Sequence, residues 1–320
     1  MNLLVTGGSG FIGSHFVRSA IDRGHSVKNI DCLTYASLGE TLSDLNSQNY
    51  SFSQIDVSNF EELNRIDFSE FDYIVHFAAE SHVDRSISSP RNFIDTNIIG
   101  TFNVLEKLKS SPRSKMLYIS TDEIYGSIDH GSWDESCPIE PRSPYSASKA
   151  SGELLCNSYR ITFGLDIVIT RTCNNFGPYQ NPEKLIPKTI INALQNRTIP
   201  VYGDGLNKRE WIFVKDNIEA IFQIISAKSI KNHIYNIGGY EIDNISLVHK
   251  ILGLMSASKD LIKFVKDRLG HDFRYSLDDS LFQKEFNKIY FNEFEANLRE
   301  TVVWYGHNMD WVNKISEKVK

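Results

Sequence analysis

Two short stretches of this sequence carry side chains suited to acid–base chemistry. The first is Ser120-Thr121-Asp122-Glu123, and the second holds Tyr145 and Lys149, which are one helical turn apart. An ammonium beside a phenol on one helix face favours the phenolate, so we expect Lys149 to lower the pKa of Tyr145 and make it a usable base. The adjacent carboxyls of Asp122 and Glu123 are suited to a second proton chemistry. Together these residues suggest hydride transfer coupled to an elimination.

Each of these pairs has a plainer interpretation. Asp122 and Glu123 could be solvated charges at the end of a strand, as most charged residues are. Tyr145 and Lys149 could be an ordinary exposed pair on a helix. We favour the catalytic interpretation because the first pair follows a predicted parallel strand, and ligands bind at the carboxyl ends of such strands.

The elements that must position these residues alternate between strands and helices, as they do around a parallel sheet. Short apolar runs alternate with helical patterns, which predicts βαβ units. The predicted strands are Leu3–Thr6, Val27–Asp31, Ser51–Ile55, Tyr73–Phe77, Met116–Ser120, Ile167–Thr170 and Ile234–Ile237. Helices are predicted to begin near Phe11, Asn59, Arg91 and Pro144, to cover Asn217–Ser226, and to begin again near Phe294. The stretch 172–210 reads as loop-rich, and Leu261–Val265 as extended. The sequence therefore predicts an α/β fold with a Rossmann-like, doubly wound parallel sheet and a smaller α/β C-terminal domain.

A glycine-rich turn between the first strand and the first helix predicts a dinucleotide site. Gly7, Gly10 and Gly13 let the backbone approach a pyrophosphate, whose charge lies at the helix N-terminus. Asp31 ends the second strand, where its carboxylate can bind the adenosine ribose and would repel a 2′-phosphate. We therefore expect NAD and not NADP. Asp56-Val57 ends the third strand and is suited either to holding the adenine amino group or to capping the strand.

Composition limits the class of protein and its partners. The chain has 320 residues, of which 41% are hydrophobic and 23% charged, as in globular proteins of about two domains. The net charge of −6 argues against nucleic acid or an anionic membrane as the main partner. Four widely spaced cysteines without a Cys-x-x-Cys pair predict neither a disulfide framework nor a metal site. Without a long apolar segment or a signal-peptide pattern, we expect a cytoplasmic protein.

A long series of motifs resembles the extended short-chain dehydrogenase/reductase family, and within it the nucleotide-sugar 4,6-dehydratases. Beyond the glycine turn and the Tyr-Lys pair, the matching motifs follow one another in the family's order. They are Ala78-Ala79-Glu80-Ser81-His82-Val83-Asp84-Arg85-Ser86, Ser120-Thr121-Asp122-Glu123-Ile124-Tyr125-Gly126, Asn174-Asn175-Phe176-Gly177-Pro178-Tyr179, Pro182-Glu183-Lys184-Leu185-Ile186-Pro187, Arg209-Glu210-Trp211, Tyr235-Asn236-Ile237-Gly238-Gly239 and Asp267-Arg268-Leu269-Gly270-His271-Asp272. The resemblance covers nearly the whole chain. It implies a homodimer formed by the helices near 91–109 and 144–163.

The resemblance also implies which residues bind the ligands. For NAD they are Gly7, Gly10, Phe11, Ile12, Gly13, Asp31, Leu33, Thr34, Asp56, Val57, Ala78, Ala79, Ser81, Thr96, Tyr145, Lys149 and Asn175. For a nucleoside-diphosphate sugar they are Ser81, Thr121, Asn174, Lys184, Tyr202, Arg209, Asn244, Arg268 and His271. We expect an NAD-binding domain over 1–171, with 211–237 returning to it, and a nucleotide-sugar-binding domain over 172–210 and 238–320.

The reaction that the resemblance implies is dehydration of a nucleoside-diphosphate glucose, with dTDP-glucose as first candidate. Tyr145 would deprotonate the C4 hydroxyl while Thr121 hydrogen-bonds its oxygen, and hydride would pass to NAD and later to C6. Glu123 would take the C5 proton, and Asp122 would protonate the leaving C6 hydroxyl. These roles need opposite protonation states, so the two pKa values must be held apart. A UDP-glucose 4,6-dehydratase, a nucleotide-sugar 4-epimerase and a non-enzymatic NAD-binding scaffold are the alternatives.

Overall fold

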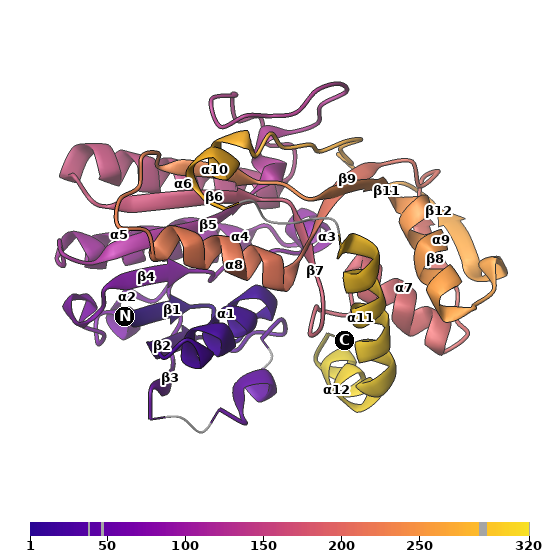
Figure 1. Ribbon diagram of the computed structural model, residues 1–320, viewed down its shortest axis with the longest axis horizontal. Helices are drawn as coiled ribbons and strands as arrows, with labels where there is room; N and C mark the ends of the chain where they lie inside the picture. Colours follow the sequence, from indigo (N-terminus) through magenta and orange to yellow (C-terminus); the bar gives the residue numbers. More distant parts are fainter. Residues whose placement is uncertain (38, 46–47, 288–292, 320) are drawn as a thin grey trace.

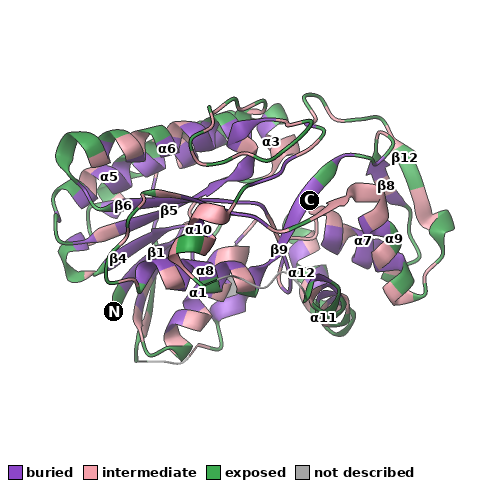
Figure 2. Cartoon of the chain, turned by 45° about the horizontal axis from the view of Figure 1, so that its top comes forward, coloured by how far each residue is buried: buried purple, intermediate pink, exposed green. Residues whose placement is uncertain are grey.

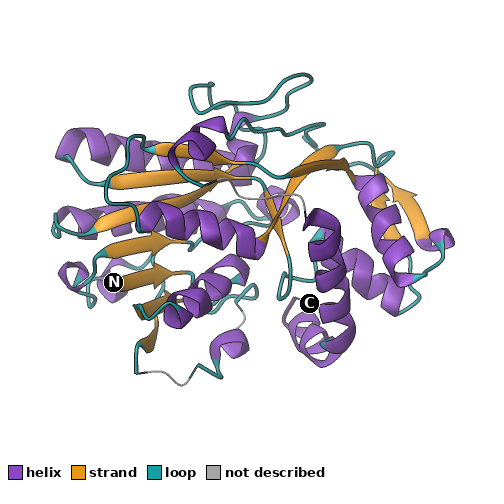
Figure 3. Ribbon diagram, in the orientation of Figure 1, coloured by secondary structure: helices purple, strands orange, loops and turns teal. Residues whose placement is uncertain are grey.

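A parallel sheet of seven strands forms the larger part of the molecule (Figures 1 and 3). The computed structural model describes residues 1–37, 39–45, 48–287 and 293–319. The strand order is β10-β6-β5-β4-β1-β2-β3, and every neighbouring pair is parallel. The strands are β1 (Asn2–Thr6), β2 (Ser26–Asp31), β3 (Tyr50–Gln54), β4 (Tyr73–His76), β5 (Lys115–Thr121), β6 (Ile167–Thr172) and β10 (Ile234–Ile237). All seven are the strands predicted from the sequence, with ends that differ by at most two residues, and the α/β fold class is confirmed.

Helices cover both faces of this sheet, which is why its strands read as apolar runs. Successive residues of one strand serve different faces: Leu3 and Val5 belong to one core cluster and Leu4 to the other. Figure 2 shows the central strands buried between these layers. The first face carries α1 (Phe11–Asp22), α8 (Val214–Ile225) and α10 (Ser280–Glu285). The second carries α2 (Phe60–Leu63), α5 (Thr101–Lys109) and α6 (Pro144–Phe163).

Two local features position the helices that matter for the site. Helix α6 begins with a capping box in which Ser143 and Ser146 exchange hydrogen bonds, and Pro144 occupies its first turn. The second feature lies between α4 (Arg91–Ile94) and α5, where a π-helical segment, η3 (Asp95–Gly100), joins them into one continuous helix. Such π segments are frequent at functional sites.

The smaller part of the molecule lies beside the carboxyl ends of the large sheet (Figure 1). Its strands are β7 (Asn174–Phe176), β9 (Lys208–Phe213) and β11 (Tyr240–Asp243) in one sheet, and β8 (Ile199–Tyr202) and β12 (Ile262–Val265) in another. Its helices are α7 (Leu185–Leu194), α9 (Asn244–Met255), α11 (Phe294–His307) and α12 (Met309–Val319). The remaining short elements are α3 (Val83–Ser88), η1 (Gly39–Leu42), η2 (Phe68–Glu70), η4 (Asp122–Tyr125) and η5 (Lys259–Leu261).

The sequence pattern was a poorer guide in this smaller part. The stretch 172–210, predicted as loop-rich, contains β7, α7, β8 and part of β9. These strands are short and gain their order from pairing with distant segments, as β9 does with β11. For the same reason Trp211–Phe213, expected with the large sheet, belong to β9 of the small sheet, whereas α8 and β10 pack on the large one. The division into two domains stays a prediction.

Candidate active site

Two cavities lie at the carboxyl ends of the large sheet and meet at Tyr145. The smaller has a volume of about 230 Å³ and the larger about 670 Å³. Tyr145, Ser81 and Lys184 line both. A crevice at the carboxyl ends of parallel strands is where α/β sheets bind their ligands. The shared wall would bring two ligands into contact at the Tyr145 side chain.

The glycine turn leaves room for a dinucleotide in the smaller cavity. Gly7 has a φ of +69°, and a Cβ atom placed on Gly13 would lie 2.3 Å from the Gly7 carbonyl oxygen. The carboxylate of Asp31 accepts hydrogen bonds from the amides of Ser9 at 3.0 Å and Leu33 at 2.8 Å, which hold it at the cavity wall. The close backbone approach and the carboxylate at the end of β2 both fit the pyrophosphate and ribose of NAD.

Fourteen of the seventeen predicted cofactor residues line the smaller cavity. They are Gly7, Gly10, Phe11, Ile12, Gly13, Asp31, Thr34, Val57, Ala78, Ala79, Ser81, Thr96, Tyr145 and Lys149. Leu33, Asp56 and Asn175 do not. The Leu33 side chain is exposed, Asn175 lines the larger cavity, and Asp56 accepts hydrogen bonds from the amide and hydroxyl of Ser58. Asp56 therefore caps the end of its strand through Oδ1, and its contact with the adenine amino group stays a prediction.

Tyr145 and Lys149 are buried, so they are not an ordinary exposed pair. Their exposed fractions are 8% and 4%. The Lys149 ammonium donates a hydrogen bond to the Ile119 carbonyl at 2.6 Å and lies over the Tyr118 ring. Burial lowers the pKa of Lys149 to about 8.

The expected lowering of the Tyr145 pKa is wrong for this structure. Burial and then the charge of Glu123 raise the pKa of Tyr145, and only a hydrogen bond with Thr121 opposes them. Desolvation of the phenolate dominates because the Tyr145 side chain itself is buried. Tyr145 therefore needs further positive charge before it can act as a base.

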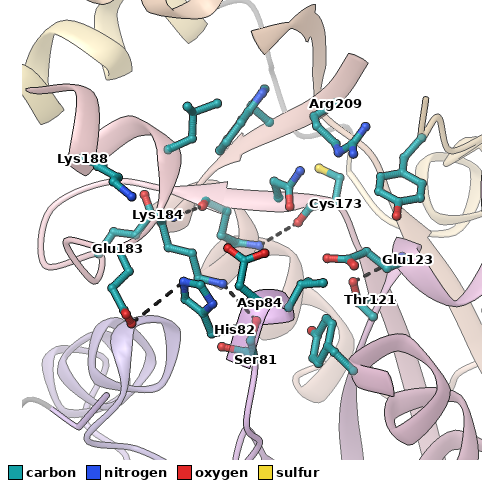
Figure 4. Close-up of a pocket in the computed structure, with 18 of the residues that line it drawn as sticks. Ser81, His82, Asp84, Thr121, Glu123, Cys173, Glu183, Lys184, Lys188 and Arg209 are labelled. Atoms are coloured by element: carbon teal, nitrogen blue, oxygen red, sulfur yellow. Dashed lines mark hydrogen bonds and ion pairs between the residues drawn. The ribbon is translucent and has the colours of Figure 1, made fainter. Parts of the chain in front are cut away.

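Thr121, Asp122 and Glu123 form a tight turn where β5 ends and η4 begins. The Thr121 hydroxyl accepts a hydrogen bond from the Glu123 amide at 3.3 Å and donates one to Asp122 Oδ1 at 3.1 Å. Thr121 and Glu123 line the larger cavity (Figure 4). Asp122 does not line it; its side chain is 2% exposed, and its Oδ2 has no hydrogen-bond partner among the described residues. Asp122 is thus not a solvated charge, whereas Glu123 is half-buried in the cavity wall.

The charged groups nearest to the two carboxyls have opposite signs. Burial raises the pKa of both. For Asp122 the charges of Glu123 and Glu210 add to burial and hold its pKa well above the usual range. For Glu123 the rise is opposed by three cations, Arg268, Lys184 and Arg209. The arrangement therefore favours a neutral Asp122 beside an ionised Glu123.

The larger cavity brings together residues from both parts of the molecule. All nine residues predicted to hold a nucleotide sugar line it: Ser81, Thr121, Asn174, Lys184, Tyr202, Arg209, Asn244, Arg268 and His271. Arg209 lies over the Tyr275 ring and donates to the Asp272 carbonyl, which fixes its guanidinium. Lysine and arginine here offer charges suited to a diphosphate.

Two residues at or beside these cavities escaped the sequence prediction. Lys188 lines the larger cavity one helical turn after Lys184, and this spacing would have revealed it had α7 been predicted (Figure 4). Asn97, in the π-helical segment, is 1% exposed. It bonds the amide and carbonyl of Glu80 and the hydroxyl of Ser148, so it ties the cofactor loop to α6. No signal in the sequence marked it. No metal site appears among the parts of the chain that the structure describes.

Comparison with known proteins agrees with this geometry. The model of the NAD dependent epimerase/dehydratase family matches residues 3–238. A dTDP-glucose 4,6-dehydratase from Streptomyces niveus is 43% identical over 319 residues, which cover 97% of this chain and 94% of that protein. The low-salt glycan biosynthesis protein Agl12 from Haloferax volcanii is 48% identical over 281 residues, covering 87% and 90%. The crystal structure of DesIV, a dTDP-glucose 4,6-dehydratase from Streptomyces venezuelae with NAD bound, has a TM-score of 0.93 and 42% identity and covers 98% of this chain and 100% of its own.

Proposed function

The chain belongs to the NAD dependent epimerase/dehydratase family, and we propose that within it this enzyme dehydrates a nucleoside-diphosphate glucose, with dTDP-glucose as first candidate. The product is the 4-keto-6-deoxy sugar nucleotide. The observation that carries the proposal is an acid pair beside the buried Tyr145: acidic neighbours add to the burial that raises the pKa of Asp122, whereas cations oppose it at Glu123. The identity to dTDP-glucose 4,6-dehydratases supports it.

The residues of the smaller cavity are suited to hold NAD. The glycine turn would hold the pyrophosphate, Asp31 would hold the ribose hydroxyls, and Tyr145 with Lys149 would adjoin the nicotinamide, where the cavities meet. When bound, NAD accepts a hydride from C4 of the sugar and returns it to C6. The positive charge of an oxidised nicotinamide bound there would oppose the burial that raises the Tyr145 pKa. Tyr145 then takes the proton of the C4 hydroxyl, and Thr121 hydrogen-bonds the C4 oxygen.

The elimination follows because a C4 ketone acidifies the C5 hydrogen. Glu123, ionised beside its three cations, takes the C5 proton. Asp122, held neutral, gives its proton to the C6 hydroxyl, which leaves as water, and Glu123 returns a proton to C5 when the hydride reaches C6. Since Asp122 lies behind Thr121, its carboxyl must turn toward the cavity. Among the described residues, the hydrogen bond to this carboxyl comes from Thr121 and Oδ2 has no partner, so the turn breaks a single hydrogen bond.

Product mass tests this function. The protein should be incubated with NAD and, in separate samples, dTDP-glucose, UDP-glucose and UDP-N-acetylglucosamine. Loss of one water from a glucose nucleotide supports the dehydratase, and the preferred nucleotide decides between thymine and uracil. Unchanged mass with a changed C4 configuration would identify a 4-epimerase. No turnover despite NAD binding would favour the scaffold.

We also propose that two chains associate through α5 and α6. These helices expose large apolar side chains: Leu154, Ile161 and Phe163 of α6 are 57%, 67% and 48% exposed, and Phe102 of α5 is 40% exposed. Leu154 and Ile161 are two helical turns apart and share a face. Contiguous apolar surface of this kind marks interaction sites. Light scattering after size exclusion should give a dimer, and Ile161→Glu should give a monomer.

A further inference from the structure

One arginine on the wall of the larger cavity links two segments that adjoin the smaller, cofactor cavity. Arg85, on α3, places its guanidinium carbon 3.8 Å from the centre of the Tyr35 ring. On its other side it donates a hydrogen bond to Glu183 Oε1 at 2.9 Å, which is also an ion pair. Tyr35 lies in the loop after β2, and Glu183 lies in the segment before α7. The bridge Tyr35–Arg85–Glu183 thus connects segments far apart in the sequence.

Both ends of this bridge adjoin the wall of the smaller cavity. Thr34 and Ala36, on either side of Tyr35, line that cavity, and so do Asn181 and Lys184 near Glu183. The Tyr35 hydroxyl also hydrogen-bonds Glu80, another residue of the wall. Widening the gap between the loop after β2 and the segment before α7 therefore separates Arg85 from at least one of its partners.

The segment before α7 makes two further contacts, both with residues that immediately precede α3. The Lys184 ammonium donates to the Ser81 carbonyl at 3.0 Å, and Glu183 Oε2 lies 4.0 Å from His82 Nε2 (Figure 4). Neither reaches the loop after β2. Of the three side-chain contacts described for the segment before α7, only the one with Arg85 involves a side chain that also contacts Tyr35.

We propose that the Tyr35–Arg85–Glu183 bridge retains NAD by holding this cavity closed between turnovers. The inference rests on the NAD-dependent function proposed above. In that reaction the hydride leaves C4 and returns to C6, so the cofactor ends each cycle oxidised and has no need to exchange. A bridge that slows cofactor release therefore does not slow turnover. Arg85 acts as a positioning residue, because it holds the walls and takes no part in the proton transfers.

The rate at which bound NAD exchanges with free NAD tests the proposal directly. Protein loaded with radiolabelled NAD is chased with excess unlabelled NAD, without sugar substrate, and the retained label is followed by rapid filtration. Arg85→Met keeps an unbranched apolar side chain but removes the charge and donors, and should speed release about tenfold, equivalent to about 1.4 kcal/mol. Glu183→Gln should speed release less, and the double variant should match Arg85→Met alone because the two side chains act through each other.

Arg23→Met is a matched control. Arg23 lies 4.2 Å from the centre of the Phe222 ring and pairs with Glu219 at 2.6 Å, and it lines neither cavity. Its release rate should equal that of the unaltered protein. Release within twofold of that rate in folded Arg85→Met and Glu183→Gln would overturn the proposal. Failure of the unaltered protein to bind NAD would refute the proposed function itself, whereas dehydration with unchanged release in the variants would refute the bridge alone.

Discussion

The substitution Asp122→Asn removes the proposed proton donor while leaving the shape of the side chain and the stability of the fold nearly unchanged. Burial and the charges of Glu123 and Glu210 keep the Asp122 carboxyl protonated in the folded protein. Asparagine has nearly the same shape and no charge, so the free energy of unfolding should stay equal or rise. What the amide lacks is a transferable proton. The substitution therefore tests catalysis without a stability defect to confuse it.

The expected size of the effect follows from general acid catalysis. Proton donation to a leaving group contributes about 10²–10⁴-fold in rate. Loss of that contribution raises the barrier to elimination by about 3 to 5 kcal/mol. Oxidation at C4 needs Tyr145, Lys149 and Thr121 but not Asp122, so its rate should hold.

A single-turnover experiment separates the two steps. With enzyme in excess over dTDP-glucose, Asp122→Asn should accumulate reduced cofactor, seen by its absorbance, because elimination lags behind oxidation. Glu123 still removes the C5 proton, so in heavy water the sugar recovered from this variant should carry deuterium at C5. Neither signal requires a finished turnover.

Two results would refute this reasoning. Turnover near that of the unaltered enzyme would show that Asp122, behind Thr121, never reaches the C6 hydroxyl. Equal slowing of oxidation and elimination would show that Asp122 acts only by holding Thr121 through their hydrogen bond.

Three further predictions concern charged groups. Glu123→Gln should reduce deuterium uptake at C5 at least about a hundredfold while NAD binding persists; normal uptake, measured by mass spectrometry, would remove Glu123 as the base. Burial raises the pKa of Glu210 from 4.5 to about 7, so the folded chain binds a proton that the unfolded chain has lost, and stability should fall as pH rises through this window. The fall is at most about 3 kcal/mol, and in urea titrations Glu210→Gln should flatten it; an identical slope in the variant would contradict this pKa. Arg171 and Glu153, each 3% exposed, form an ion pair at 2.5 Å. Arg171→Met should lower the free energy of unfolding by about 3 to 5 kcal/mol, and adding Glu153→Leu should recover part of it; no recovery would mean that other Arg171 contacts dominate.

The large sheet and the cofactor turn could be predicted because their signals are local. Leu3, Leu4 and Val5 read as one apolar run since the strand is buried on both faces. Gly13 is required by a close approach within a few residues, since a Cβ on it would lie 2.3 Å from the Gly7 carbonyl oxygen, and Gly7 has a positive φ of +69° in the turn. The smaller sheets were not predicted, since their short strands are ordered by partners far along the chain.

By itself the sequence determined the parallel sheet, the dinucleotide turn with Asp31, and the residue types that could share acid–base work. Only the tertiary structure decided the charge states of those residues. A pKa depends on burial and on charges from other segments, and here enclosure raised the pKa of Tyr145 against the effect expected from Lys149. Likewise, cations from the segment before α7, from β9 and from the loop before residue 270 oppose the rise in the Glu123 pKa, whereas Asp122 has carboxylates beside it. The Arg85 bridge has the same origin, because its partners meet only when the two parts of the molecule pack together.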